Sequence, residues 1–226
     1  MVSVEWVFFD LNGTLLDPSG MAAELGGGEE ARRLVQGAFE EALLLAMADT
    51  LSGAYRPLSE HLRAALERWL FVSGHEMQAL ESMMRRADAM DPFPHAEQAL
   101  KRLADAGLHV AVLTNSSAQS ARSSLRQAGL LDAVAAVIGS EAVRVYKPHP
   151  MVYRRGVEQV GAAPERCCMV AAHGWDLMGA ARVGLRTAWV AHLEQRLPAT
   201  IPEPDLRADD LAGAARAIVD QLTGTR

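Results

Sequence analysis

The stretch VEWVFFDLNGTL, residues 4–15, decides the fold. Its first part, Val4–Phe9, is an apolar run of the kind that forms a strand buried on both faces of a sheet. Asp10 follows at the carboxyl end of that strand, where open α/β sheets place their ligands. Gly13 then allows a tight turn and a close approach of backbone to a bound group. A carboxylate in this position can attack carbon or phosphorus and form an ester, although an aspartate that merely ends a strand is an equal alternative.

The rest of the chain alternates strand-like runs with helical patterns. Further apolar runs occur at Leu108–Leu113, Val134–Ile138, Cys167–Ala171 and Thr187–Val190. Helical spacing of apolar residues occurs over Ala96–Ala106, Ala118–Ala128, Met151–Val160 and Asp210–Leu222. Because strands and helices alternate and the strands are apolar on both sides, the sequence predicts a parallel, doubly wound, Rossmann-like α/β sheet.

Residues 18–90 differ from this pattern, because they contain long helical runs and no strand signal. The clearest helices cover Ala31–Met47 and Leu58–Phe71, and the stretch DPFP at residues 91–94 returns the chain to the α/β pattern. We therefore predict a core built from residues 1–17 and 91–226 and an inserted helical cap at 18–90. Two independent domains are the weaker alternative, because the sheet needs the strand that precedes the insertion.

The composition excludes several classes of protein. The chain has 226 residues, a net charge of −6 and no basic cluster, so we expect no nucleic-acid partner. No apolar stretch is long enough to span a membrane, and the acidic N-terminus does not resemble a signal peptide. Cys167 and Cys168 are neighbours in one predicted strand and point to opposite faces, so we expect no disulfide. These features favour a cytoplasmic protein.

Three later segments place polar side chains after predicted strands. Thr114 and Asn115 end one strand, Lys147 precedes a predicted helix, and His173, Trp175 and Asp176 follow another strand. Each segment taken alone has an ordinary structural explanation, such as a helix cap or a solvated lysine. Together with Asp10 they lie at carboxyl ends of strands in one sheet, and this convergence is what an active site requires.

These segments resemble the ordered motifs of a known superfamily. The stretches DLNGTL (10–15), LTNSS (113–117), YKP (146–148) and AAHGWDLMGA (171–180) are similar to the four motifs of the haloacid dehalogenase superfamily. The resemblance covers residues 4–17 and 91–195, and it places the helical insertion where that superfamily carries its cap. It implies a hydrolase with Asp10 as covalent nucleophile. Phosphatases, phosphotransferases and dehalogenases all share these motifs, so the resemblance does not by itself specify the reaction.

Two departures disfavour the phosphatase reaction. Phosphatases of this superfamily carry a second aspartate at the position of Asn12, and an amide cannot exchange a proton near neutral pH. They also hold Mg²⁺ with an acidic pair, whose first member is replaced here by Ala172. If the chain is nevertheless a phosphatase acting on a small phosphomonoester, Mg²⁺ binds at Asp10 and Asp176.

The motifs are closest to the L-2-haloacid dehalogenase subgroup, which implies hydrolysis of a small 2-haloalkanoic acid with no metal or other cofactor. Asp10, Lys147 and Asp176 are then the catalytic residues: Asp10 attacks, Lys147 keeps it ionised, and Asp176 activates or positions water. The expected substrate-binding residues are Thr14, Thr114, Asn115, Tyr153, His173 and Trp175. The alternative from another functional class is a binding protein that retains this fold and catalyses no reaction.

Several positions depart from that subgroup as well. Its halide-binding arginine lies on the first cap helix, where an ungapped comparison places Gln36, with Arg32 and Arg33 close by. His173 replaces an asparagine, and it either orients water, binds the substrate carboxylate or serves as a structural hydrogen-bonding group. The expected partner is a small anionic molecule, and the resemblance also allows a homodimer.

Overall fold

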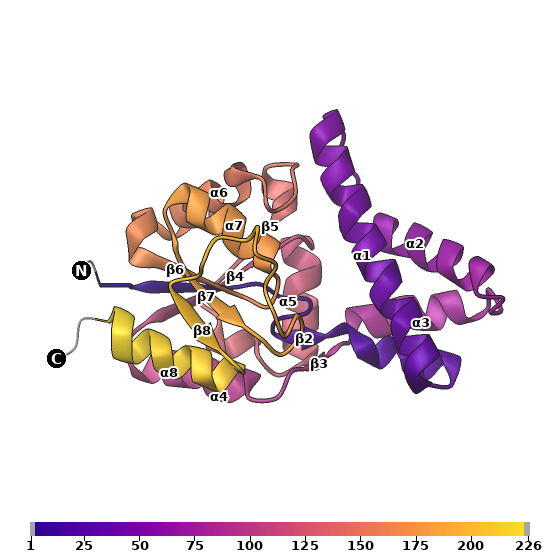
Figure 1. Ribbon diagram of the computed structural model, residues 1–226, viewed down its shortest axis with the longest axis horizontal. Helices are drawn as coiled ribbons and strands as arrows, with labels where there is room; N and C mark the ends of the chain where they lie inside the picture. The colour runs from indigo at the N-terminus through magenta and orange to yellow at the C-terminus, as the bar shows by residue number, and fades with distance from the viewer. Residues whose placement is uncertain (1–2, 224–226) are drawn as a thin grey trace.

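A six-stranded parallel sheet forms the centre of the molecule. The computed structural model describes residues 3–223. The strands are β1 (Trp6–Phe9), β4 (His109–Thr114), β5 (Ala136–Gly139), β6 (Cys167–Ala171), β7 (Arg186–Val190) and β8 (Leu206–Ala208). Their order is β5-β4-β1-β6-β7-β8, and every neighbouring pair is parallel. β1 therefore occupies the middle of the sheet, with β4 and β6 as its partners (Figure 1).

Helices cover both faces of the sheet, as the alternating pattern predicts. One face packs against α4 (Ala96–Asp105), α5 (Ala118–Gln127) and α8 (Leu211–Leu222), and the other against α6 (Pro150–Val160) and α7 (Gly174–Val183). Because side chains alternate along a strand, Cys168 lies in the first of these two cores and Cys167 in the second. Both thiols are free and buried. The predicted doubly wound α/β fold is confirmed.

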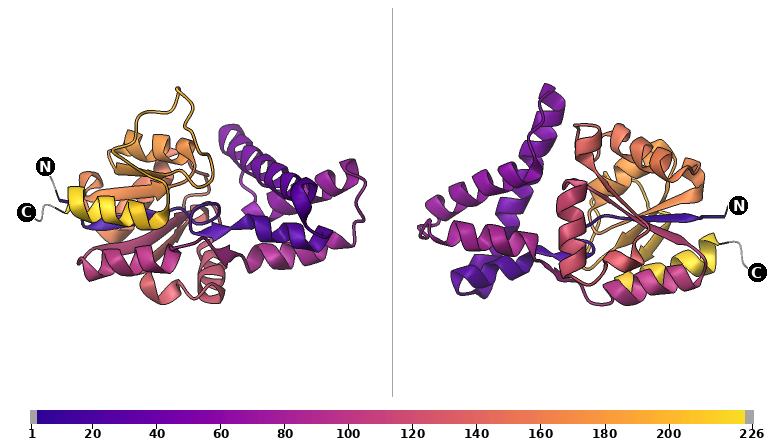
Figure 2. Two further views of the ribbon diagram at one scale, coloured as in Figure 1. Left: turned by 60° about the horizontal axis from the view of Figure 1, so that its bottom comes forward. Right: turned by 180° about the vertical axis from the view of Figure 1, so that it is seen from behind.

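The segment between β1 and α4 is helical and has an apolar core of its own. It contains the 3₁₀ helix η1 (Pro18–Leu25) and the helices α1 (Gly28–Ser52), α2 (Leu58–Val72) and α3 (Ala79–Asp88). The two connections to the sheet run side by side as the short antiparallel strands β2 (Leu16–Asp17) and β3 (Asp91–Pro92). Figures 1 and 2 show these helices as a lobe beyond the carboxyl end of the sheet.

The observed elements differ from the predicted ones in a few places. The 3₁₀ helices η2 (Leu131–Ala133), η3 (Ser140–Ala142) and η4 (Pro164–Arg166), together with α3, α7, β8 and the pair β2–β3, have no predicted counterpart. The sequence of α7 includes two glycines and therefore has a weak helical signal. The short strands have too few residues to show alternation. Helix α1 is longer at both ends than the predicted Ala31–Met47. Between residues 3 and 223, no helix has the length and apolarity needed to cross a bilayer.

Candidate active site

The turn after β1 places Asp10 at the centre of the carboxyl edge of the sheet. The Asp10 backbone N–H donates to the Val170 carbonyl of β6 at 3.0 Å, which continues the sheet pairing up to this residue. Gly13 has a φ of +87°, a backbone conformation that few residues other than glycine adopt. A Cβ atom at Gly13 would lie 2.6 Å from Cε1 of His173. Glycine at this position therefore allows the turn to pack directly against the imidazole.

Lys147 joins two carboxylates that come from different ends of the chain. Its Nζ donates to Asp10 Oδ1 at 2.7 Å, to Asp176 Oδ2 at 2.6 Å and to the Leu113 carbonyl at 2.9 Å. All three hydrogens of the ammonium group are therefore used, and the Lys147 side chain is completely buried. The structure thus brings the three expected catalytic residues into direct contact.

The charges in this cluster determine the pKa of each group. Burial opposes the ionisation of Asp10, but the Lys147 ammonium and the His173 imidazole hold the pKa of Asp10 well below its usual range. Burial raises the pKa of Asp176, although Lys147 acts against it. Burial also works against the charge of Lys147, yet the two carboxylates keep the Lys147 pKa above its ordinary value. Asp10 is accordingly a carboxylate and Lys147 an ammonium at neutral pH.

Thr14 and Tyr153 support this cluster from behind. The Thr14 hydroxyl donates to Asp10 Oδ2 at 3.0 Å and accepts from the Ala172 backbone N–H at 3.0 Å. The Tyr153 hydroxyl lies 2.6 Å from Asp176 Oδ1. Neither side chain lines the cavity described next. Thr14 and Tyr153 therefore contact the carboxylates of the cluster and are not exposed to that cavity.

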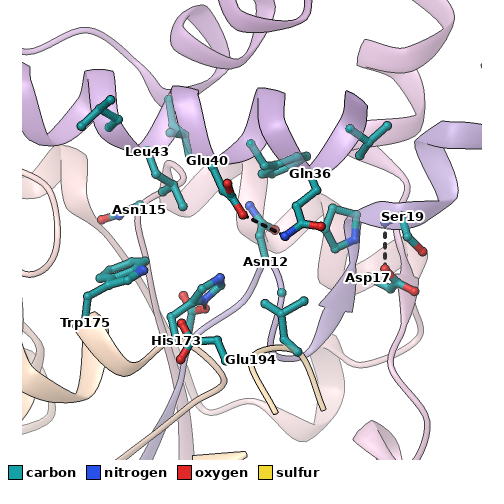
Figure 3. Close-up of a pocket in the computed structure, with 18 of the residues that line it drawn as sticks. Asn12, Asp17, Ser19, Gln36, Glu40, Leu43, Asn115, His173, Trp175 and Glu194 are labelled. Carbon is teal, nitrogen blue, oxygen red and sulfur yellow. Dashed lines mark hydrogen bonds and ion pairs between the residues drawn. The ribbon is translucent and has the colours of Figure 1, made fainter. Parts of the chain in front are cut away.

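A cavity of about 850 Å³ lies between the sheet edge and the helical lobe. Its sheet side includes Asp10, Asn12, Thr114, Asn115, His173 and Trp175. Its opposite side is formed by α1, through Val35, Gln36, Phe39, Glu40, Leu43, Leu44 and Met47. Figure 3 shows the side chains of His173 and Trp175 on one side and those of Gln36, Glu40 and Leu43 on the other. A molecule in this cavity can therefore reach Asp10.

Asn115 lines the cavity and has an unused hydrogen-bond donor. Its Oδ1 accepts from the Lys147 backbone N–H at 2.8 Å, and its carbonyl accepts from the Ser140 hydroxyl at 3.0 Å. These contacts fix the amide, and its Nδ2 is buried without a hydrogen-bond partner among residues 3–223. A buried donor without a partner is energetically costly, so it is well suited to bind an anion or a leaving group.

His173 immediately precedes α7 and lies beside Asp10. Its Nδ1 is 3.5 Å from Asp10 Oδ2, and its ring centroid is 5.3 Å from that of Trp175. Burial lowers the His173 pKa, but Asp10, Asp176 and Glu194 outweigh burial and raise it above the ordinary value. The imidazole therefore takes part in the charge distribution around Asp10.

The α1 side of the cavity is sparse in polar contacts. The Gln36 amide donates to Glu40 Oε1 at 2.9 Å, and both side chains line the cavity. Arg32 also lines it, whereas Arg33 pairs with Glu29 in solvent. Of the residues near the expected arginine position, Gln36 and Arg32 thus lie at the cavity and Arg33 does not. On the sheet side, the Asn12 amide donates to the Ser116 hydroxyl at 3.2 Å.

The site does not fit a bound Mg²⁺. The Lys147 ammonium lies between Asp10 and Asp176, in the position where a cation shared by these carboxylates would bind. Asp176 has no exposed surface. Within the described part of the chain, no cluster of three or more acidic, histidine or cysteine side chains has the geometry of a metal site.

The contacts of two residues at the site were not predicted from the sequence. Glu194 lines the cavity and accepts from the Gly174 N–H at 3.0 Å. Tyr146, the residue before Lys147, is held by the helical lobe, because its N–H donates to Thr50 Oγ1 at 2.9 Å and its hydroxyl donates to the carbonyl of Arg56. Glu194 lies in an irregular segment with no periodic signal, and a hydroxyl on a helix such as Thr50 has no sequence feature that marks it as a partner.

Known proteins with similar sequences and structures carry related descriptions. A (S)-2-haloacid dehalogenase from Xanthobacter autotrophicus is 32% identical over 199 residues, covering 85% of this chain and 77% of the relative. A phosphoserine phosphatase from Thermus thermophilus is 33% identical over 152 residues, covering 66% of this chain and 60% of the relative. The structure of the L-2-haloacid dehalogenase from Xanthobacter autotrophicus with covalently bound chloropropionic acid superimposes with a TM-score of 0.88 and 26% identity, covering 96% of this chain and 99% of that one.

The family model described as haloacid dehalogenase-like hydrolase matches residues 4–184, which is most of the chain. This match agrees with the sheet order, with the helical insertion after β1 and with the meeting of the four motifs at one edge of the sheet. The chain belongs to the haloacid dehalogenase-like hydrolases.

Proposed function

We propose that this chain hydrolyses small 2-haloalkanoic acids through an ester on Asp10. The observation that carries the proposal is the ion cluster, in which Lys147 contacts both carboxylates and Asp10 lines the cavity. A phosphate ester needs compensation of its charge and protonation of its leaving group. A halide leaves without a proton, so Asn12 at the acid/base position is compatible with dehalogenation. The dehalogenase relatives support the same assignment.

In the first step, a carboxylate oxygen of Asp10 attacks the carbon that bears the halogen. The new C–O bond forms as the carbon–halogen bond breaks, and the electron pair leaves with the halide. Lys147 keeps Asp10 ionised, and Thr14 orients it from behind. Asn115, whose amide N–H has no partner among residues 3–223, and Trp175 line the same cavity and are suited to bind the leaving halide or the substrate carboxylate.

In the second step, water attacks the carbonyl carbon of the Asp10 ester and releases a 2-hydroxy acid. Thr114 lines the cavity beside Asn115, while Tyr153 holds Asp176, which in turn holds Lys147. No step requires a metal ion or another cofactor. Location in the cytoplasm and assembly as a homodimer belong to the same proposal, and light scattering after gel filtration tests the second.

A single turnover in ¹⁸O-water tests the ester. With enzyme in excess over 2-chloropropionate, the label is expected in the Asp10 carboxylate and not in the lactate product. Peptide mass spectrometry locates the label, and the Asp10→Asn variant provides a chain that cannot be labelled in this way. Label in the product of the first turnover would mean that water attacks the substrate directly, and the proposed mechanism would fail.

A magnesium-dependent phosphatase is the second candidate, because a phosphoserine phosphatase is among the relatives. Halide release and phosphate release from a panel of small 2-haloacids and phosphomonoesters distinguish the two activities. We expect halide release that persists in EDTA. Phosphate release that EDTA abolishes and Mg²⁺ restores would support the phosphatase, and tight binding of a ligand with neither activity would support a silent binding protein.

A further inference from the structure

The residue before Lys147 is enclosed by the helical lobe. Tyr146 is only 1% exposed, although it belongs to the core segment between β5 and α6. Its ring stacks on that of Tyr55, with centroids 5.2 Å apart, and meets the ring of His61 edge-on at 6.3 Å. Its hydroxyl donates to the carbonyl of Arg56. The lobe thus forms a socket for this side chain, made of Tyr55, Arg56 and His61.

A buried carboxylate keeps the socket in shape. Asp49, near the end of α1, accepts from Arg56 Nη1 at 2.7 Å through Oδ1, and its Oδ2 lies 3.1 Å from His61 Nε2. The guanidinium of Arg144 lies over the Tyr55 ring, 5.1 Å from its centroid. Because a buried, paired charge is costly to separate from its partners, the socket has little freedom to rearrange.

Two successive backbone N–H groups attach the segment that carries Lys147 to the two parts of the molecule. The Tyr146 N–H donates to Thr50 Oγ1 on α1 at 2.9 Å, and the Lys147 N–H donates to Asn115 Oδ1 of the core at 2.8 Å. The residues of α1 that line the cavity end at Met47, so Thr50 lies beyond them. This contact of α1 with the core is therefore separate from the part of the helix that faces the cavity.

We infer that Tyr146 is a positioning residue for Lys147, through which the helical lobe acts on the chemistry, an inference that rests on the proposed dehalogenation. The Lys147 ammonium contacts Asp10 at 2.7 Å and Asp176 at 2.6 Å, so it fits closely between them. A shift of the backbone at residues 146–147 moves Nζ away from at least one carboxylate. A misplacement of about 1 Å in an active site can reduce turnover by about 10²-fold.

Thr50→Val tests this inference in the full-length protein, because valine keeps the shape of threonine and removes the acceptor of the Tyr146 N–H. With folding checked by circular dichroism, kcat for 2-chloropropionate should fall by roughly 10- to 100-fold. Lys147 is completely buried and does not line the cavity, so KM should change by less than about twofold. Thr50→Ser keeps the hydroxyl and should restore most of the lost turnover.

The pH profile separates positioning from a loss of stability. The charged groups that face Asp10 are Lys147 and His173, with Asp176 in contact with Lys147, and Thr50→Val alters none of them. Displacement of Lys147 weakens the interaction that holds the pKa of Asp10 well below its usual range, so this pKa rises. On acidification, kcat/KM should therefore decline at a pH about one unit higher than in wild type. A variant that is merely less stable keeps the wild-type profile.

The hydrogens of the Lys147 ammonium report its position without any substrate. All three are held by buried acceptors and should exchange slowly with water. A slowly exchanging ammonium signal should therefore be present in the ¹⁵N NMR spectrum of wild type and absent from that of Lys147→Met. In Thr50→Val its exchange should be at least about tenfold faster than in wild type.

Ser124→Ala is the matched control. The Ser124 hydroxyl donates to the Asp88 carbonyl at 3.1 Å, so it also joins the core to the lobe, but through α5 and α3. Its loss should leave kcat, the pH profile and the ammonium exchange unchanged. Tyr146→Phe removes only the hydroxyl that donates to Arg56. It should change all three quantities in the same direction as Thr50→Val but by less, and it provides the test if Thr50→Val does not fold.

The inference fails if Thr50→Val and Tyr146→Phe lose stability but keep the wild-type pH profile and ammonium exchange, or if Ser124→Ala reproduces their effects. Absence of halide release by wild type from every 2-haloacid would instead refute the proposed function. The ammonium exchange would then still decide whether Tyr146 positions Lys147.

Discussion

The two sides of the cavity are built in different ways. On the sheet side, Asp10, Lys147 and Asp176 come from three separate segments and are buried, with contacts of 2.6–2.7 Å. On the α1 side, a single helix supplies apolar side chains and one hydrogen bond, between Gln36 and Glu40. The sheet side has almost no freedom to rearrange, whereas the helix side makes few specific contacts. The difference indicates that the sheet determines the reaction and the helix determines which molecules reach it.

Physical chemistry explains why the two sides tolerate change differently. A buried ion pair loses its water on folding, so removal of one partner leaves an uncompensated charge at a large cost in free energy. Exposed polar groups keep their water, and their interactions contribute little to stability. The following experiments test this contrast, in order of decreasing expected effect.

Replacement of Lys147 by methionine should have the largest effect. The Asp10 and Asp176 carboxylates would remain buried without their shared cation, so the free energy of unfolding should fall by about 3–5 kcal/mol. Turnover should fall by at least about 10³-fold, because Asp10 would no longer be held ionised. Denaturant titration and halide release measure the two losses.

The double variant Lys147→Met/Asp176→Asn is the control for this experiment. It removes one of the two uncompensated charges and leaves an amide oxygen for the Tyr153 hydroxyl. Part of the lost free energy of unfolding should be recovered, whereas halide release should remain as low as in Lys147→Met. Near-normal turnover in either variant would mean that another cation activates Asp10.

Replacement of Tyr153 by phenylalanine should have an intermediate effect. The change removes the hydroxyl group that lies 2.6 Å from Asp176 Oδ1 and leaves the ring in place. Stability should fall by about 1–3 kcal/mol, because a buried carboxylate loses a donor. Since Tyr153 touches Lys147 only through Asp176, turnover should fall less than in Lys147→Met. Denaturant titration and steady-state kinetics measure both quantities, and a loss of turnover as large as that of Lys147→Met would place Tyr153 in direct contact with substrate.

A change on the α1 side should alter binding and not chemistry. Glu40→Gln removes a negative charge from a cavity that receives an anionic substrate, and the new amide oxygen can still accept from Gln36. The KM for a 2-haloacid should fall by up to about fivefold with kcat unchanged, because an exposed charge contributes at most about 1 kcal/mol. The effect should shrink in about 0.5 M salt.

Glu29→Gln is the matched control for Glu40, because Glu29 lies on the same helix, pairs with Arg33 in solvent and does not line the cavity. It should leave KM unchanged. A change in kcat for Glu40→Gln would contradict the division of roles between the two sides of the cavity.

The two cysteines should have no effect on activity. Burial raises the pKa of the Cys167 thiol to about 12 and also raises that of Cys168, with nearby acidic groups adding to both shifts. Near pH 8 the reactive thiolate is therefore almost absent. Native protein should not react rapidly with a thiol reagent, and turnover should be unchanged after treatment. Loss of activity in parallel with thiol modification would contradict this expectation.

The sheet could be predicted from the sequence because each of its long strands carries a local signal. Cys167–Ala171 is apolar throughout, and the observed strand has these same bounds. β8 has three residues, one of them exposed, so neither length nor pattern distinguishes it from a loop. The helix α7 begins with glycine, and its identity depends on packing against β6 and β7, which a local pattern does not contain.

The candidate site could be predicted in part, because residues that follow parallel strands must meet at one edge of the sheet. This geometric rule is enough to bring Asp10, Thr114 and Asp176 together. It does not predict which polar atoms have hydrogen-bond partners and which have none. Only the structure shows that Tyr153 and Lys147 occupy both oxygens of Asp176, whereas Nδ2 of Asn115 stays unpaired. These outcomes depend on side-chain directions, which residue order does not specify.

The central place of β1 has a consequence for how the chain is made. Residues 6–9 leave the ribosome well before both of their strand partners, which lie at residues 109–114 and 167–171. The apolar strand that precedes Asp10 therefore has both of its edges covered only after synthesis has reached residue 171. Pairings between distant segments form slowly, and unpaired strand edges promote aggregation. The helical insertion, which has an apolar core of its own, is complete well before that point.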